Sequence, residues 1–144
     1  MAHSAQRKPK VLTSGLSVLI VLSTATGLSS CGFSASSPRG VTQNFISAMQ
    51  DKDWEAACQS LSQDFIHRHM NGDSRFCVNY LEQWHGGGNT FEGMSVPSQE
   101  TETRSDGTLV TVDLADGSTD RARVVDQNGE LKLSRYPGQD RGAR

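Results

Sequence analysis

The sequence predicts an α+β domain, in which two to three N-terminal helices pack on an antiparallel sheet of about four strands. Between positions 41 and 85, apolar residues recur at helical spacing. From position 90 onward the period changes to two, and three turn dipeptides separate the alternating runs. Helices followed by a meander of strands are typical of domains whose helices cover one face of a sheet.

Three helices are expected in the first half of the domain. The first begins near Arg39 and ends near Gln50. Asp53 is suited to cap a second helix, expected to continue through Phe65, because its carboxylate can accept from the free amides of the first turn. Turn residues at 71–74 introduce a third helix, and the glycines at 86–88 end it. The apolar stripes are Val41, Phe45, Ala48 and Met49; Trp54, Ala57, Cys58, Leu61 and Phe65; and Phe76, Cys77, Tyr80, Leu81 and Trp84.

Strands joined by tight turns are expected in the second half. Phe91 to Val96 alternates loosely, Pro97 ends that strand or places it at an edge, and 99–104 is polar and tolerant of β structure. Asp-Gly or Asn-Gly pairs at 106–107, 116–117 and 128–129 favour hairpins because these residues tolerate positive φ. Alternation indicates one buried and one solvated face. The expected inward residues are Val110, Val112, Leu114, Ala122, Val124, Leu131 and Leu133.

The first thirty residues have the features of a bacterial lipoprotein signal peptide. Basic residues at positions 7, 8 and 10 precede an apolar stretch, no acidic residue occurs, and Leu28-Ser29-Ser30-Cys31 follows. The expected organisation is a signal peptide over 1–30, a lipid tether over 31–38, one domain over 39–136 and a flexible tail over 137–144. Cys31 would carry the lipid and hold the domain on the extracytoplasmic face of the cell membrane. The alternatives are an ordinary signal peptide with a nearby free cysteine, or an uncleaved anchor.

Composition after residue 30 limits the possible partners. The remaining 114 residues hold all sixteen acidic but only eleven basic residues, a formal net charge of −5. Nucleic-acid binding needs a concentrated basic face, so we expect no nucleic-acid partner. With Cys31 set aside, Cys58 and Cys77 are the two remaining cysteines, and disulfides persist outside the cytoplasm. We expect them to form a disulfide between the second and third helices; two unpaired buried thiols are the alternative.

The segment from Phe45 to Cys58, with its corner Asp51-Lys52-Asp53-Trp54 and an Ala-rich second helix, resembles small bacterial lipoproteins of the nuclear transport factor 2-like superfamily. The resemblance covers roughly 39–136 and rests on the corner and the element order. It implies a curved sheet that wraps the helices into a cystatin-like cone, often around a pocket. The same cone serves isomerases, dehydratases, polyketide cyclases and non-catalytic modules, so it implies a fold more than an activity. The residues expected to line such a pocket are Phe45, Trp54, Leu61, Tyr80 and Trp84.

Catalytic and metal-binding residues are not indicated. His67, His69 and His85, with Asp64 and Asp73, lack the spacing of a zinc site, so we expect solvent-exposed histidines, no metal and no cofactor. Members of the superfamily that are enzymes use an acid or a His–Asp pair, which this chain does not match. The polar residues near the apolar faces are Tyr80, Asp64 and His85. Trp54 and Trp84 are expected to pack in the core.

Two functions from different classes follow from these observations. The first is a lipid-anchored binding or assembly module of the cell envelope, without catalysis, that docks a protein partner on the solvated sheet face. That face carries Thr111, Asp113, Arg121, Arg123 and Lys132. The alternative is a small-ligand-binding protein, or an isomerase- or dehydratase-like enzyme, that uses a cavity between helices and sheet.

Overall fold

The computed structural model describes residues 36–88, 90–98 and 101–141. The expected signal peptide, Cys31 and most of the tether lie outside the described residues. Among the described residues, four α-helices precede a four-stranded antiparallel sheet, so the predicted α+β class is confirmed. No helix within the described ranges is long and apolar enough to span a membrane.

The helices begin at the polar residues that cap them. Helix α1 (Pro38–Gln50) starts where the Ser37 side chain accepts from the Gly40 amide. Asp53 caps α2 (Trp54–Gln59), as the sequence predicts, by accepting from the Ala56 amide at 3.0 Å. Asp73 caps α4 (Ser74–His85). Each cap satisfies amides that have no partner within the helix.

The second helix was expected to continue through Phe65, and this prediction is wrong. Helix α2 ends at Gln59, and residues 60–62 are not helical. Ser62 caps a separate helix, α3 (Gln63–His69). The segment between the two helices pairs with strand residue Leu133, which lies opposite Leu61. The Ser62 amide donates to the Leu133 carbonyl and the Leu133 amide donates to the Ser60 carbonyl, both at 2.8 Å. These hydrogen bonds to a strand edge replace those that a continuous helix would make.

The sheet follows chain order, β1 (Thr101–Arg104), β2 (Gly107–Asp113), β3 (Thr119–Gln127) and β4 (Glu130–Arg135). All three predicted turn dipeptides lie at hairpin turns, and both residues of Asn128-Gly129 have positive φ. The strand expected over 91–96 is wrong, since only Ser95 pairs, with Asp113. Gly93 adopts a φ of 73° there, which takes the chain out of extended conformation.

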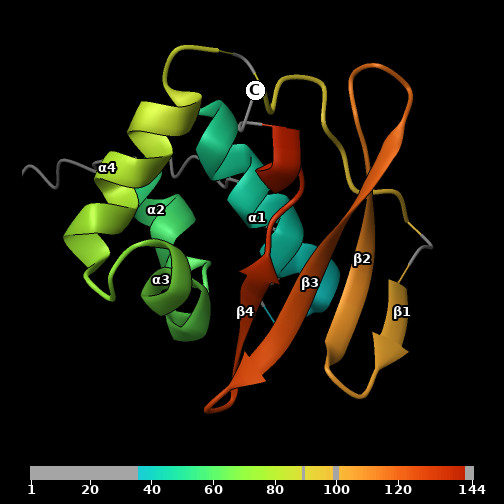
Figure 1. Ribbon diagram of the computed structural model, residues 1–144. Helices are drawn as coiled ribbons and strands as arrows, with labels where there is room; N and C mark the ends of the chain where they lie inside the picture. The colour runs from blue at the N-terminus through green and yellow to red at the C-terminus, as the bar shows by residue number, and fades with distance from the viewer. Residues whose placement is uncertain (1–35, 89, 99–100, 142–144) are drawn as a thin grey trace, which may run out of the picture.

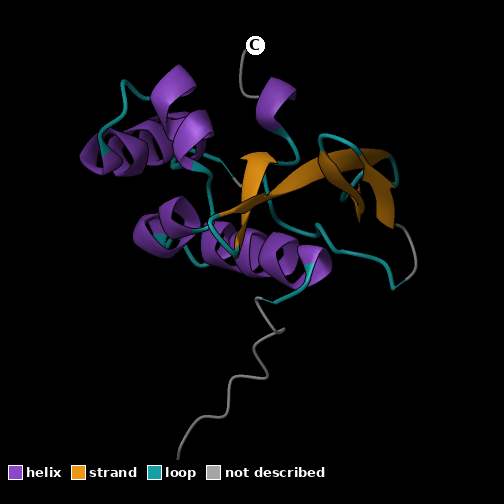
Figure 2. Cartoon of the chain, turned by 90° about the horizontal axis from the view of Figure 1, so that it is seen from below, coloured by secondary structure: helices purple, strands orange, loops and turns teal. Residues whose placement is uncertain are grey.

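One face of the sheet is covered by helix and the other is solvated. Helix α1 packs across β2, β3 and β4, while α2, α3 and α4 gather beyond the β4 side (Figures 1 and 2). Alternate strand residues fill the space beneath α1. The fully buried ones include Val110, Val112, Ala122, Val124 and Leu133.

The end of the domain lies beyond the expected boundary at Tyr136. Tyr136 and Pro137 are fully buried, and the Gly138 amide donates to Asp120 at 2.7 Å. A short 3-10 helix over Gln139–Arg141 follows. The expectation of a flexible tail over 137–144 is therefore wrong for 137–141, because an apolar contact and a charge-assisted hydrogen bond attach this segment to β3. Residues 142–144 lie outside the described residues.

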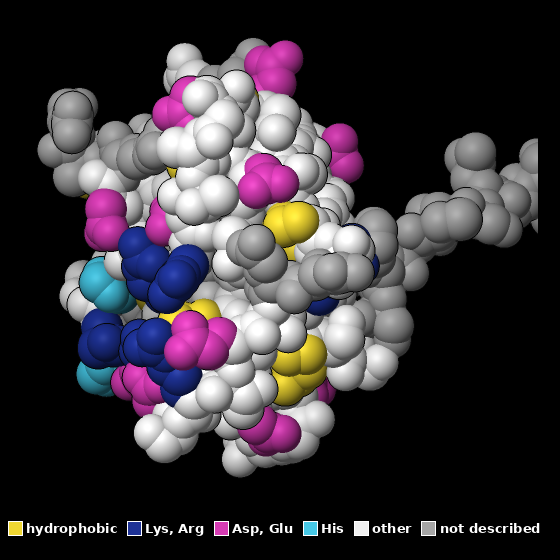
Figure 3. Space-filling model, turned by 90° about the vertical axis from the view of Figure 1, so that its right-hand side faces the viewer, with side chains coloured by type: hydrophobic (Ala, Val, Ile, Leu, Met, Phe, Trp, Pro, Cys, Tyr) yellow, Lys and Arg dark blue, Asp and Glu magenta, His cyan; other side chains and the backbone are white. Residues whose placement is uncertain are grey.

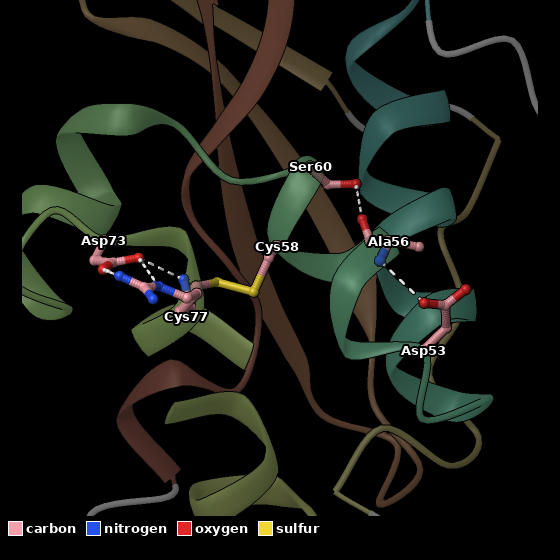
Figure 4. Close-up of a disulfide and its surroundings, with 7 residues drawn as sticks. Asp53, Ala56, Cys58, Ser60, Asp73 and Cys77 are labelled. Atoms are coloured by element: carbon pink, nitrogen blue, oxygen red, sulfur yellow. Dashed lines mark hydrogen bonds and ion pairs between the residues drawn. A yellow bond between two sulfur atoms is a disulfide. The ribbon is translucent and has the colours of Figure 1, made fainter. Parts of the chain in front are cut away.

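The predicted disulfide is confirmed. Cys58 of α2 and Cys77 of α4 are bonded, with their Cα atoms 6.0 Å apart (Figure 4). Their sequence separation is 19 residues. Cys77 is fully enclosed and Cys58 nearly so. The bond thus joins two short helices within the core.

Removing the disulfide should destabilise the domain by about 3 kcal/mol, the value that the chain-entropy model gives for a closed loop of this length. The variant is the double substitution Cys58→Ala and Cys77→Ala, and the measurement is urea unfolding. Cys31→Ala is the matched control and should unfold at the wild-type midpoint. Equal midpoints for the double variant and wild type, or free thiols at both positions by mass after alkylation, would contradict the assignment.

Candidate functional site

The five residues expected to line a pocket do not share one cavity. Phe45 and Leu61 belong to the buried core, and Trp54 and Tyr80 pack partly buried against it. Trp84 is 49 % exposed, so its expected place in the core is wrong. Aromatic rings fill the centre of the fold instead: Phe45 contacts Phe91 and Tyr136 at centroid distances of 5.8 and 5.3 Å.

A cleft of about 350 Å³ lies where α1 and α4 end, against the turn at 90–93. Gln50 holds this turn on α1, because its side-chain nitrogen donates to the Phe91 carbonyl at 2.8 Å. His85 forms part of the opposite wall. The cleft is lined by Met49, Gln50, Lys52, His85, Gly88, Phe91, Glu92 and Gly93.

His85 is buried, which corrects the expectation of a solvent-exposed histidine. Its Nε2 lies 3.1 Å from the Tyr136 hydroxyl. Burial lowers the pKa of His85, and burial followed by the interaction with Tyr80 raises the pKa of Tyr136. Both groups are therefore neutral near pH 7.

The chemistry of this His–Tyr pair is limited by its enclosure. His85 Nδ1 is buried and has no hydrogen-bond partner within the described residues. An unpaired buried polar group lowers the stability of the folded state by about 1–3 kcal/mol, so packing around His85 must offset this loss. Because the atom is shielded from solvent as well, the imidazole forms the cleft wall rather than presenting a base to a ligand.

Sequence reasoning missed Tyr136 as a member of this cluster. The inward residues of β4 follow period two, as at Leu131 and Leu133, and Tyr136 falls one position out of that register. The strand ends at Arg135, which frees the next residue to turn inward. The large aromatic ring at this position was the available signal, since aromatic side chains bury large areas in protein cores.

The other candidate metal ligands stay apart. Asp64 forms an exposed ion pair with Arg68 at 2.7 Å, and Asp73 caps α4 and pairs with Arg75. The hydrogen bond from Arg75 lowers the pKa of Asp73. His67 and His69 are exposed near the end of α3, as predicted for these two. Within the residues that the structure describes, no three His, Cys, Asp or Glu side chains gather to hold a metal ion.

The outward face of the sheet carries four of the five residues expected to dock a partner, namely Thr111, Asp113, Arg121 and Arg123. Thr111 and Arg121 are opposite each other in the β2–β3 ladder. The fifth is placed differently: the Lys132 side chain donates to the Gln59 carbonyl of α2 at 2.9 Å and is 23 % exposed. Basic side chains gather on this side of the molecule among acidic ones (Figure 3). Ion pairs connect them, including Arg123 with Asp106 at 2.9 Å. Exposed pairs of this kind contribute about 0–1 kcal/mol each, so little stability is lost when they exchange partners.

Comparisons with known proteins add no assignment. No protein-family model matches this chain, and neither a curated protein nor a solved structure does.

Stability should fall in acid because of His85. Its folded-state pKa lies below the ordinary value of 6.5, so the unfolded chain takes up the proton more readily. Above the pKa of His85 in the unfolded chain, the imidazole is neutral in both states and the free energy of unfolding has its full value. As the pH falls below that pKa, the free energy of unfolding decreases by at most about 1.4 kcal/mol per pH unit.

The measurement is urea unfolding between pH 4.5 and 8. In His85→Gln, the free energy of unfolding should fall less steeply as the pH is lowered. In His67→Gln, which changes an exposed position, it should fall as steeply as in the wild type. An unchanged slope in His85→Gln would show that His85 does not titrate as its burial requires.

Proposed function

We propose that this protein is a lipid-anchored binding module on the extracytoplasmic face of a bacterial membrane. The observation that carries the proposal is the Cys58–Cys77 disulfide. Structural disulfides persist in oxidising compartments and are rare in the cytosol. An internal disulfide therefore favours export of the domain. The signal-peptide pattern that ends at Cys31 favours export as well.

The position of Cys31 supports anchoring rather than release. It lies seven residues before Pro38, the first residue of α1, and follows Leu28-Ser29-Ser30 directly. A diacylglycerol on the cysteine sulfur supplies two acyl chains, and two chains hold a protein on a membrane where one does not. The domain then stands on a short tether at the membrane surface.

The outward sheet face is the surface that we assign to a protein partner. Its arginines are exposed or half-exposed and pair with acidic neighbours at the surface, such as Arg121 with Glu102 at 3.9 Å. Since such pairs are weak, an acidic patch on a partner can replace them at small cost. The same charges would also fix how the two proteins are aligned and oriented in the complex.

Ligand binding in the cleft beside His85 is the second candidate. The cleft has a suitable volume for a small molecule, at about 350 Å³. A catalytic role is weaker, because the buried imidazole is shielded and Asp64 lies exposed in an ion pair with Arg68. We therefore assign no reaction to this site.

Cys31→Ser should abolish anchoring. Wild-type cells given labelled palmitate should yield labelled protein in the membrane fraction, whereas the variant should be unlabelled and either soluble or an uncleaved precursor. Ser30→Ala retains a small residue before the cysteine and serves as the matched control, with wild-type labelling. Label in Cys31→Ser would contradict the lipidation site.

A photo-crosslinking residue at Arg121 should capture an envelope protein in intact cells. The same residue at Asp51, which is exposed at the end of α1, is the control and should capture none. Adding Arg123→Glu should reduce the adduct, because it reverses a charge on the same face. Equal adducts from both positions, or none from Arg121, would count against docking on the sheet.

A further inference from the structure

The sheet has one edge that the fold leaves open. The strand order β1-β2-β3-β4 places β1 and β4 at the two edges (Figure 1). On the β4 side, Leu133 pairs with Leu61, and the end of β2 that extends past β1 pairs through Asp113 with Ser95. Within the described residues, β1 pairs with β2 alone, and all four residues of β1 are exposed. The outer side of β1 is therefore a free edge.

A free edge offers backbone groups to another strand. In antiparallel strands, alternate residues direct their N–H and C=O groups toward one neighbour, so about half of the residues of β1 direct theirs outward. Proteins commonly block such an edge with repelling charges, a proline or a bulge. Strand β1 contains no proline and pairs with β2 in unbroken register. Its two charged residues, Glu102 and Arg104, have opposite signs, so they do not repel every incoming strand.

These two charges are available to a second strand. They lie on the same face of β1 because they are two residues apart. The Arg104 side chain donates to the two Glu102 carboxylate oxygens at 3.0 and 3.2 Å, and the two side chains are 46 % and 56 % exposed. Exposed ion pairs contribute little to stability, so each group can exchange its partner at small cost.

The charge order of β1 is complementary to itself. Two copies that meet at the same edge are related by a twofold axis, run antiparallel and make every contact twice. An axis at Thr103 places Glu102 of one protomer opposite Arg104 of its partner, at both ends. An axis at Glu102 or at Arg104 would instead place like charges opposite each other, which is destabilising. The charges therefore favour one register, in which Thr103 lies opposite its own copy.

We propose that two copies of this chain pair through β1, about a twofold axis at Thr103, and so join their sheets into one. This inference goes beyond the proposed anchor and partner and depends on neither. The solvated faces that carry Arg121 and Arg123 become continuous across the dimer, so a partner would meet both copies. A pairing of four-residue strands buries a small area, and the dimer is reversible.

A cysteine on the twofold axis tests the register. In Thr103→Cys, the two Cα atoms should be about 4.5–5.5 Å apart, within the range that a disulfide spans. Intact cells that make the full chain are oxidised with copper phenanthroline, and dimers are measured on non-reducing gels. Thr101→Cys is the matched control on the same strand. Its copy would lie about 13 Å away along the strands, so it should give no dimer above the background of the unsubstituted chain.

Charge exchange tests the contact itself. In the Thr103→Cys background, Glu102→Arg should abolish the dimer, because arginines then lie opposite each other. Adding Arg104→Glu to Glu102→Arg exchanges the two signs and should restore the dimer. Cells that make Glu102→Arg and Arg104→Glu chains with different tags should yield the mixed dimer and neither homodimer. All three positions are exposed, so each variant should keep the Cys58–Cys77 disulfide, as measured by mass after alkylation.

The other outcomes overturn the proposal. Equal dimers from Thr101→Cys and Thr103→Cys would show collision rather than a fixed register. A dimer that persists in the Glu102→Arg chain would show that these charges do not meet. The absence of a dimer from Thr103→Cys, or an adduct with a different protein in its place, would show that β1 does not pair with a second copy.

Discussion

The Cys58–Cys77 disulfide is the constraint on which the helical half of this structure depends. Helix α2 has six residues and α3 has seven, whereas isolated helices shorter than about 12–15 residues are marginal in water. Their stability therefore comes from tertiary contacts. The disulfide attaches α2 to α4, and the pairing of Leu61 with Leu133 attaches the following segment to the sheet. Between them, these two links hold the short helices at the β4 side.

The same bond determines what each side of α4 contacts. With Cys77 turned toward α2, Leu81 and His85 enter the core, and the ring cluster around Phe45 and Tyr136 fills the space where a cone would have its pocket. Phe76 and Trp84 are left outside. With its interior filled by these rings, the domain offers its outer surface and the cleft beside His85 for contacts.

Local signals in the sequence predicted most elements but not their limits. Asp53 marked the start of α2 and Asn128-Gly129 marked a hairpin, because a cap or a turn depends on neighbours in the chain. The break at Ser60–Ser62 was missed, although Ser62 is itself a capping residue, because the apolar stripe continues through it to Phe65. That break depends on hydrogen bonds to Leu133, more than seventy residues away.

By itself, the sequence determined the α+β order and the pair of cysteines available for a disulfide, since these depend on period and residue count. Only the tertiary structure decided that His85 is buried and Trp84 exposed. The apolar stripe of α4 is wider than the surface its neighbours can cover, and the covered side is centred on Cys77, Leu81 and His85. Which part of a helix is covered follows from how distant elements dock, and spacing within the helix does not carry that information.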